Sequence, residues 1–151
     1  MKIYIGGRIS GLSYEDASNY FNTTKSNLEE MGYAVLSPMT AKNALRTEIK
    51  LKSTDYSNPV STNHAIFERD KWCVEQSDIF YLNLLACGSN FVSMGGVTEL
   101  AWASLRGKHT IVVMQKDNIH RHAFILEAAD IVFETHEEAI DYLYKLITQT
   151  G

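Results

Sequence analysis

The stretch DIFYLNLL (Asp78–Leu85) is apolar at nearly every position. Such a strand is typical of the centre of a parallel sheet, because helices cover both of its faces there. Apolar residues at helical spacing precede it in Ala65–Gln76, and the apolar segment GGVTELAWASLRGK (Gly95–Lys108), which also predicts a helix, follows it. We therefore expect an α/β fold with residues 78–85 as a central strand.

Further strands and helices alternate on both sides of this stretch. A Ser13–Asp16 capping box begins a helix that ends at Gly32, and Thr135–Glu138 caps a last helix. Other short apolar runs predict four more strands, at Lys2–Gly6, Tyr33–Leu36, His109–Met114 and Asp130–Phe133. Five strands with short right-handed crossovers indicate a flavodoxin-like, doubly wound parallel sheet of order 2-1-3-4-5 with helices on both faces. The polar residues 40–62 predict a long excursion, in part helical or mobile.

Length and composition limit the classes of protein to consider. The 151 residues predict one domain, 1–151, and the net charge of -4 argues against a nucleic-acid polymer as partner. Cys73 and Cys87 lack CxxC spacing, which indicates reduced thiols and a cytoplasmic protein. The N-terminal MKIYIGG is too short for a signal peptide, and no apolar run approaches the length of a membrane span.

The loop GGRISG (Gly6–Gly11) follows the first strand, at the edge where such sheets bind ligands. It is neither a P-loop, since Leu12 stands where lysine is needed, nor a GxGxxG loop, since Arg8 replaces the second glycine. Two interpretations remain open. The loop is a flexible strand-to-helix turn, or it forms a backbone collar around a sugar or phosphate with Arg8 and Ser10 pointing into the pocket. Its candidate binding residues are Gly6, Gly7, Arg8, Ile9 and Ser10.

Two carboxylates and a tyrosine are candidates for chemistry. Glu99 is predicted in the first turn of its helix, where an acid either interacts favourably with the helix N-terminus or acts as a nucleophile at the open end of the sheet. Asp70, in FERDKW, is by default a surface acid. Together with Tyr4, however, both carboxylates are predicted to face the same crevice, and two carboxylates across one pocket are what glycosyl chemistry requires.

Other residues give weaker signals. His120 and His122 lack the pattern of a metal site, so we expect no metal. Trp72 and Trp102 pack in the core by default, yet with Phe124 they also offer apolar surface for contact between subunits.

The segments MKIYIGG, RDKWCVEQSDIFYLNL and GGVTELAWASLRGK resemble the nucleoside 2-deoxyribosyltransferases and their relatives, the deoxynucleoside 5'-monophosphate N-glycosidases. The resemblance is most specific in G-x-x-x-E-L-x-x-A-x-x-x-G-K and weakest in residues 40–62. It implies that Glu99 is the nucleophile, that Tyr4 hydrogen-bonds its carboxylate, and that Asp70 contacts the nucleobase or assists its departure. It also implies that GGRISG lines the base and sugar.

Two departures from the family pattern concern the substrate. Ser93 stands where transferases of free nucleosides often carry aspartate, whereas the monophosphate glycosidases tend to have serine there. The C-terminal KLITQTG lacks the aromatic terminal residue of some transferases, so IHRHAFILEAAD, with His122, is expected to come from a neighbouring subunit. The resemblance thus implies a homo-oligomer with shared sites, in which Ser93, Gly95, Gly96 and His122 bind substrate.

These residues predict deoxyribose transfer between nucleobases. Glu99 attacks C1' of a 2'-deoxynucleoside, the base leaves, and a second base attacks the covalent intermediate with net retention. This chemistry needs no metal or organic cofactor. Two alternatives remain: a hydrolase of deoxynucleoside monophosphates, favoured by Ser93, Arg8 and the histidines, and a nucleotide-binding module without turnover.

Overall fold

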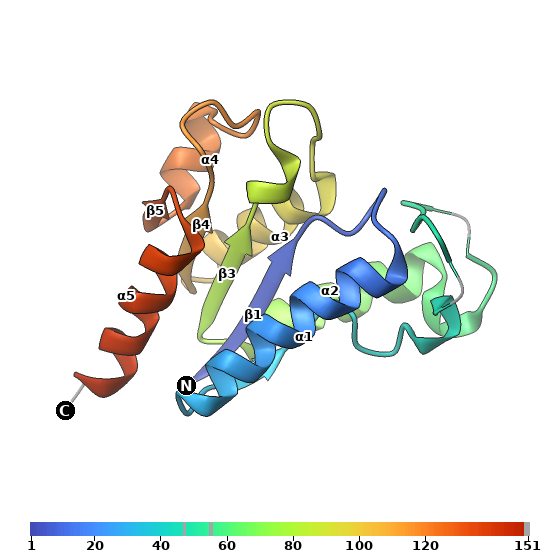
Figure 1. Ribbon diagram of the computed structural model, residues 1–151, viewed down its shortest axis with the longest axis horizontal. Helices are drawn as coiled ribbons and strands as arrows, with labels where there is room; N and C mark the ends of the chain where they lie inside the picture. Colours follow the sequence, from blue (N-terminus) through green and yellow to red (C-terminus); the bar gives the residue numbers. More distant parts are fainter. Residues whose placement is uncertain (47, 55, 150–151) are drawn as a thin grey trace.

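Five parallel strands form the sheet at the centre of the molecule (Figure 1). The computed structural model describes residues 1–46, 48–54 and 56–149. The strand order is β2-β1-β3-β4-β5, and every neighbouring pair is parallel. The predicted flavodoxin-like sheet is therefore confirmed. Its strands are β1 (Lys2–Gly7), β2 (Ala34–Leu36), β3 (Ile79–Asn83), β4 (His109–Val113) and β5 (Ile131–Phe133).

The helices follow the predicted alternation, with one addition. They are α1 (Tyr14–Glu30), α2 (Asn63–Gln76), α3 (Met94–Leu105), α4 (Ala123–Ala128) and α5 (His136–Thr148). Helix α4 was not predicted, because six residues are too few to show helical periodicity. In the part of residues 40–62 that the structure describes, the regular elements are the single-turn 3-10 helices η1 (Asn43–Leu45) and η2 (Pro59–Ser61). No helix among the described residues has the length and apolar character needed to cross a membrane.

Alternation along the strands assigns side chains to the two faces of the sheet. Ile3 and Ile5 of β1 pack in the cluster that contains α1 and α5. Tyr4, between them, belongs to the opposite cluster with residues of α2, α3 and α4. Figure 1 shows the same layers, with α1 and α5 in front of the sheet and the other helices behind it. Tyr4 is thus brought to the face on which α2 and α3 carry the two candidate carboxylates.

The glycine pair at the end of β1 has a packing reason. A Cβ on Gly7 would lie 2.9 Å from the carbonyl oxygen of Asn83, and a Cβ on Gly6 would lie 3.0 Å from the Phe80 ring. Backbone and ring atoms cannot give way to such contacts at low cost. The pair lets β1 run close beside β3, and because the two strands are parallel, the loops after both leave the same edge of the sheet.

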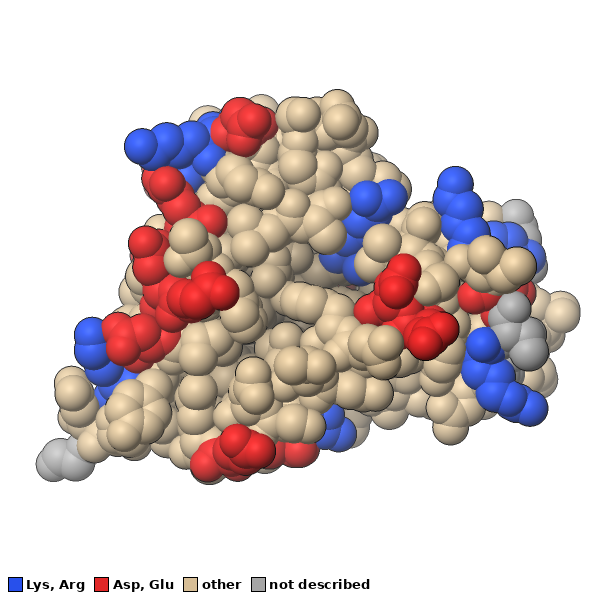
Figure 2. Space-filling model, in the orientation of Figure 1, with Lys and Arg blue, Asp and Glu red and all other residues tan. Residues whose placement is uncertain are grey.

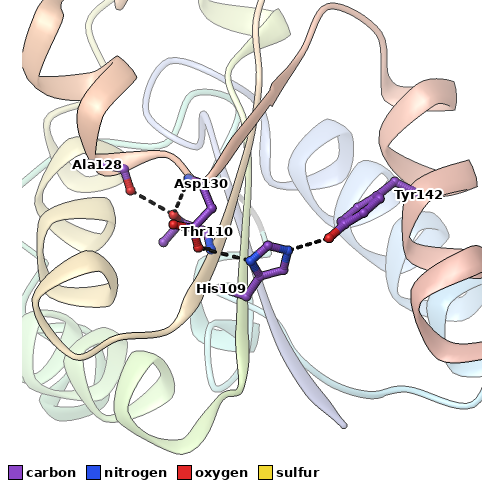
Figure 3. A network of polar contacts seen from close by, with 5 residues as sticks. All are labelled: His109, Thr110, Ala128, Asp130 and Tyr142. Atoms are coloured by element: carbon purple, nitrogen blue, oxygen red, sulfur yellow. Dashed lines mark hydrogen bonds and ion pairs between the residues drawn. The ribbon is translucent and has the colours of Figure 1, made fainter. Parts of the chain in front are cut away.

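A polar network joins β4, β5 and α5 at the edge of the sheet where β4 and β5 begin, opposite the edge from which the loop after β1 leaves (Figure 3). The Asp130 carboxylate accepts from the backbone N–H of Thr110 at 2.9 Å and pairs with His109 Nδ1 at 3.0 Å. His109 Nε2 contacts the Tyr142 hydroxyl at 2.7 Å. Burial acts to raise the pKa of Asp130, but the hydrogen bonds from Thr110 and His109 together lower it. We assign this network to holding the sheet edge.

The outer surface of α2, α3 and α4 is unusually apolar. Trp72 is 54% exposed, so its predicted core position is wrong. Leu105 and Phe124 are 82% and 80% exposed on the same side of the sheet. Trp102 is half-buried and meets Phe67 edge to face, with ring centroids 5.0 Å apart. Large apolar residues gathered on one side of a protein usually mark a contact surface.

Candidate active site

A cavity of about 450 Å³ lies at the carboxyl edge of the sheet. Its wall combines the loop after β1, the 38–56 segment, α2 and the first turns of α3. In Figure 2 the surface is hollowed beside a group of positively charged side chains over the loop that follows β1. The volume falls in the range of small-molecule sites, and the position is the one at which open α/β sheets bind ligands.

Glu99 is a buried carboxylate in the cavity wall. Helix α3 begins at Met94, so Glu99 lies in its second turn, and the predicted place in the first turn is wrong. Its side chain is 8% exposed, and its Oε2 has no hydrogen-bond partner among the described residues. Favourable interaction with a helix N-terminus is confined to the first turn, so it does not account for this carboxylate. A buried acceptor without a partner in the described part of the chain calls for a functional explanation.

Asp70 shares the cavity with Glu99. It is half-buried on α2, and its Oδ1 also has no partner in the described part of the chain. Burial, and then the charge of Asp70, raise the pKa of Glu99 to about 8. Burial likewise raises the pKa of Asp70, while the charges of Lys42 and Arg69 act in the opposite direction. The charge of Asp70 thus opposes ionisation of Glu99, so the two carboxyl groups titrate as a coupled pair.

Tyr4 lies behind Glu99 and does not line the cavity. Its side chain is fully buried, and its ring stacks on Phe80 with centroids 5.5 Å apart. Burial and the charges of Glu99 and Asp70 raise the pKa of its hydroxyl well above 10.0. In return, the hydroxyl acts to lower the pKa of Glu99. Tyr4 is thus placed to act on a ligand only through the Glu99 carboxylate.

Ser93, Gly95 and Gly96 form the start of α3 and line the cavity. Ser93 is the N-cap, and its Oγ accepts from the backbone N–H of Gly96 at 3.2 Å. A Cβ on Gly96 would lie 2.8 Å from that Oγ. A Cβ on Gly95 would meet only the Oε1 of Glu99, at 3.9 Å. Gly96 is therefore required by packing, whereas Gly95 leaves open space beside the carboxylate.

Of His120 and His122, it is His120 that contacts a residue of the cavity wall, Ser93. The backbone N–H of Ser93 donates to His120 Nε2 at 2.9 Å, and His120 Nδ1 pairs with Asn118 Oδ1 at 2.8 Å. His122, which was predicted to bind substrate, is exposed at the N-cap of α4 and does not line this cavity. Among the described residues, no three His, Cys, Asp or Glu side chains gather as a metal site would require.

The GGRISG loop is divided between wall and support. Gly7, Ile9 and Ser10 line the cavity, whereas Gly6 and Arg8 do not. The Arg8 guanidinium donates to the carbonyl oxygens of Ser10 and Ala86, both at 3.1 Å, and lies 4.0 Å from the centroid of the Phe91 ring. Arg8 therefore ties the loop after β1 to the segment before α3. The interpretation in which Arg8 points into the pocket is wrong, because its guanidinium is held by these contacts outside the cavity wall.

The 38–56 segment supplies wall residues that the sequence did not single out, chiefly Lys42, Leu51, Lys52 and Tyr56. Lys42 is 5% exposed, which is rare for a lysine. Its burial depends on how this segment folds over α2. In a polar tract with many lysines and serines, no local pattern distinguishes a buried lysine from a solvated one.

Comparisons with known proteins match this architecture. A domain family of unknown function (DUF4406) matches residues 1–69, and no curated protein sequence matches significantly. A 2-deoxyribosyltransferase from the psychrotolerant bacterium Bacillus psychrosaccharolyticus is 20% identical, with a TM-score of 0.65 over 94% of this chain and 92% of that chain. A 2-deoxyribosyltransferase from Leishmania mexicana is 14% identical, with a TM-score of 0.63 over 99% of both chains.

The chain has the fold of the 2-deoxyribosyltransferases. A CMP N-glycosidase from Clostridium botulinum shares this fold, at 15% identity and a TM-score of 0.59 over 95% of this chain and 97% of that chain. The resemblance predicted from the motifs is therefore confirmed at the level of the fold. At these identities, any activity must be argued from the site of this chain.

Proposed function

We propose that the protein transfers 2'-deoxyribose between nucleobases, with Glu99 as the nucleophile. The observation that carries the proposal is the Glu99 carboxylate itself, which is buried, lines the cavity and leaves Oε2 without a partner among the described residues. A nearby second carboxyl group, Asp70, supports glycosyl chemistry. The transferases and the N-glycosidase that share the fold support the same class of reaction.

The first half-reaction forms an ester between Glu99 and the sugar. A Glu99 carboxylate oxygen attacks C1' as the C1'–N bond breaks, through an oxocarbenium-like transition state. The electron pair of that bond remains on the base, and Asp70 supplies the proton that neutralises it. Lack of a 2'-hydroxyl makes the oxocarbenium ion easier to form, which favours deoxyribose. Tyr4 favours the charged form of Glu99, the form that attacks.

The second half-reaction reverses these steps with another base. A ring nitrogen of the incoming base attacks C1', the ester bond breaks, and its electron pair returns to Glu99. Asp70 takes the proton of the incoming base. Two inversions give net retention. No step requires a metal ion or an organic cofactor.

The surrounding residues have supporting roles in this proposal. Gly7, Ile9, Ser10 and Ser93 contact the base and sugar from the cavity wall. His122 is exposed beside Phe124, with ring centroids 5.5 Å apart, and would reach the cavity of a second subunit. We therefore propose a homo-oligomer with shared sites. Cys73 and Cys87 are free and buried, which supports a cytoplasmic location, and deoxyribose transfer between bases would serve nucleotide salvage.

The decisive experiment replaces the nucleophile. Deoxyinosine or deoxycytidine is mixed with adenine, and deoxyadenosine formation is followed by chromatography. We expect Glu99→Ala to fold normally and to lose turnover by several orders of magnitude. Glu30→Ala, at an exposed glutamate on α1 across the sheet, is the matched control and should retain the wild-type rate. A Glu99→Ala protein with more than about a tenth of the wild-type rate would refute the nucleophile assignment.

A hydrolase of 2'-deoxynucleoside 5'-monophosphates is the second candidate, favoured by Ser93. Its hydroxyl can donate to a phosphate, and Ser93→Asp keeps a good N-cap for α3, so this variant should fold. If the substrate is a monophosphate, Ser93→Asp raises its KM sharply, because like charges face each other in a partly desolvated cavity. If it is a free nucleoside, the change is tolerated. Release of cytosine from the monophosphate without transfer to adenine would establish the hydrolase.

A further inference from the structure

Lys42 is a buried lysine to which the described part of the chain offers no hydrogen-bond or ion-pair partner. Its side chain is 5% exposed and lines the cavity, and no hydrogen bond or ion pair holds its ammonium among the described residues. Burial lowers its pKa, while the charges of Asp70 and Glu99 favour the ammonium form. Neither carboxylate lies within the 4.0 Å of an ion pair. A desolvated ammonium without direct partners is costly unless a ligand supplies an acceptor.

The backbone beside Lys42 also departs from the ordinary. Ala41 has a φ of 62°, in the left-handed region that favours glycine, and it is the one non-glycine residue with positive φ in the described part of the chain. This conformation precedes η1 and accompanies the inward placement of the lysine. Strain of this kind persists where the surrounding structure holds a side chain in a required place.

We propose that the Lys42 ammonium binds the carbonyl oxygen of the departing nucleobase and stabilises the negative charge that forms on it. This inference rests on the proposed function and deepens it. When the C1'–N bond breaks, its electron pair spreads over the base onto the exocyclic oxygen, which then becomes a stronger acceptor for a cationic donor. Lys42 keeps its proton throughout, and Asp70 supplies the one that the base takes.

The assignment predicts a substrate preference. Bases with a carbonyl oxygen, such as uracil, thymine, cytosine and hypoxanthine, present an acceptor to Lys42. Adenine has no carbonyl oxygen and gains less. Deoxynucleosides of carbonyl-bearing bases should therefore be the better donors, and Lys42 should matter more for their cleavage than for that of deoxyadenosine.

Binding of the free base tests this without turnover. In a Glu99→Ala background, calorimetry with uracil and with adenine compares Lys42 with Lys42→Met and Lys42→Arg. We expect Lys42→Met to weaken uracil binding at least about tenfold, adenine binding by less than about threefold, and Lys42→Arg to restore part of the loss. Lys116→Met, at an exposed lysine, is the control. Melting curves check folding, and Lys42→Met should melt no lower, since a buried charge is removed.

Kinetics distinguish this inference from the proposed function. With Glu99 present, Lys42→Met should slow release of thymine about tenfold more than release of a nitro-substituted uracil, whose anion needs less stabilisation. Uracil binding that is unchanged in Lys42→Met, or an equal loss for uracil and adenine, would overturn the role of Lys42. Lys42-dependent uracil binding in a wild-type protein that cleaves no deoxynucleoside would instead refute the transferase proposal alone.

Discussion

The backbone N–H of Ser93 donates to His120 Nε2 at 2.9 Å, so an imidazole outside the cavity wall holds the residue that begins α3. His120 Nδ1 lies 2.8 Å from Asn118 Oδ1, an acceptor, which places the proton of the neutral ring on Nδ1 and leaves Nε2 free to accept. Protonation of Nε2 would remove the acceptor for Ser93. Burial lowers the pKa of His120 from 6.5, in keeping with a ring held neutral.

This relationship predicts how stability depends on pH. Because the folded state resists protonation of His120, its contribution is fully present above pH 6.5 and decreases as the pH falls below that value towards the folded pKa. His120→Gln keeps an acceptor that does not titrate, so the decrease between about pH 7.5 and pH 5 should be smaller. Denaturant unfolding across this range measures the difference.

Two further variants sharpen that test. His120→Phe leaves the Ser93 N–H without an acceptor and should cost about 1–3 kcal/mol at pH 7.5, and less at lower pH, where the wild-type imidazole no longer accepts. His136 also has a lowered pKa because of burial, so part of the wild-type decrease should persist in His120→Gln. Identical slopes for wild type and His120→Gln would show that His120 does not carry the effect.

Tyr4→Phe is predicted to shift the pH profile of activity. The hydroxyl acts to lower the pKa of Glu99, so its removal should raise that pKa above about 8 and move the acid limb of kcat/KM to higher pH. Activity should therefore fall more at pH 6 than at pH 8.5. The variant should fold, since the ring keeps its stacking on Phe80. Superimposable profiles would mean that Tyr4 only packs against Phe80.

Gly95 and Gly96 form a matched pair of substitutions. Gly95→Ala adds a methyl group beside Glu99 Oε1, on the side from which we expect C1' to approach, and beyond its chain neighbours and the backbone of α3 the methyl group meets no other atom of the described residues within 4 Å. It should lower kcat/KM at least about tenfold while stabilising α3 by up to about 1 kcal/mol. Gly96→Ala collides with Ser93 Oγ and Leu82, and should destabilise the fold by about 1–3 kcal/mol. Full activity in Gly95→Ala would mean that C1' does not bind beside Oε1.

Assembly is predicted to use the outer side of α2, α3 and α4. Sedimentation should show a homodimer or larger oligomer, and Leu105→Glu, at an 82% exposed apolar position, should shift it towards monomer. Tyr144→Glu, at an exposed position on α5 across the sheet, is the control. A fully active wild-type monomer at assay concentration would contradict both the oligomer and the shared site.

Local signals were enough to predict the architecture. The apolar run of β3, the capping Ser13 and the glycine that ends β1 each report on neighbours in sequence, and right-handed crossovers then leave few strand orders. The start of α3 was placed one residue late, and Glu99 lies in its second turn, not in the first turn expected from the sequence. Helix α4 was missed because a single turn and a half shows no period.

The sequence alone determined the sheet and its strand order, because strand and helix patterns are properties of short segments and right-handed crossovers leave few orders. Only the tertiary structure decided that Lys42 is buried, that His120 and not His122 reaches the α3 N-cap, and that Arg8 supports the loop. Each of these depends on contacts between segments far apart in the chain. Burial and partner choice are set by the packing of the whole fold, which no local pattern encodes.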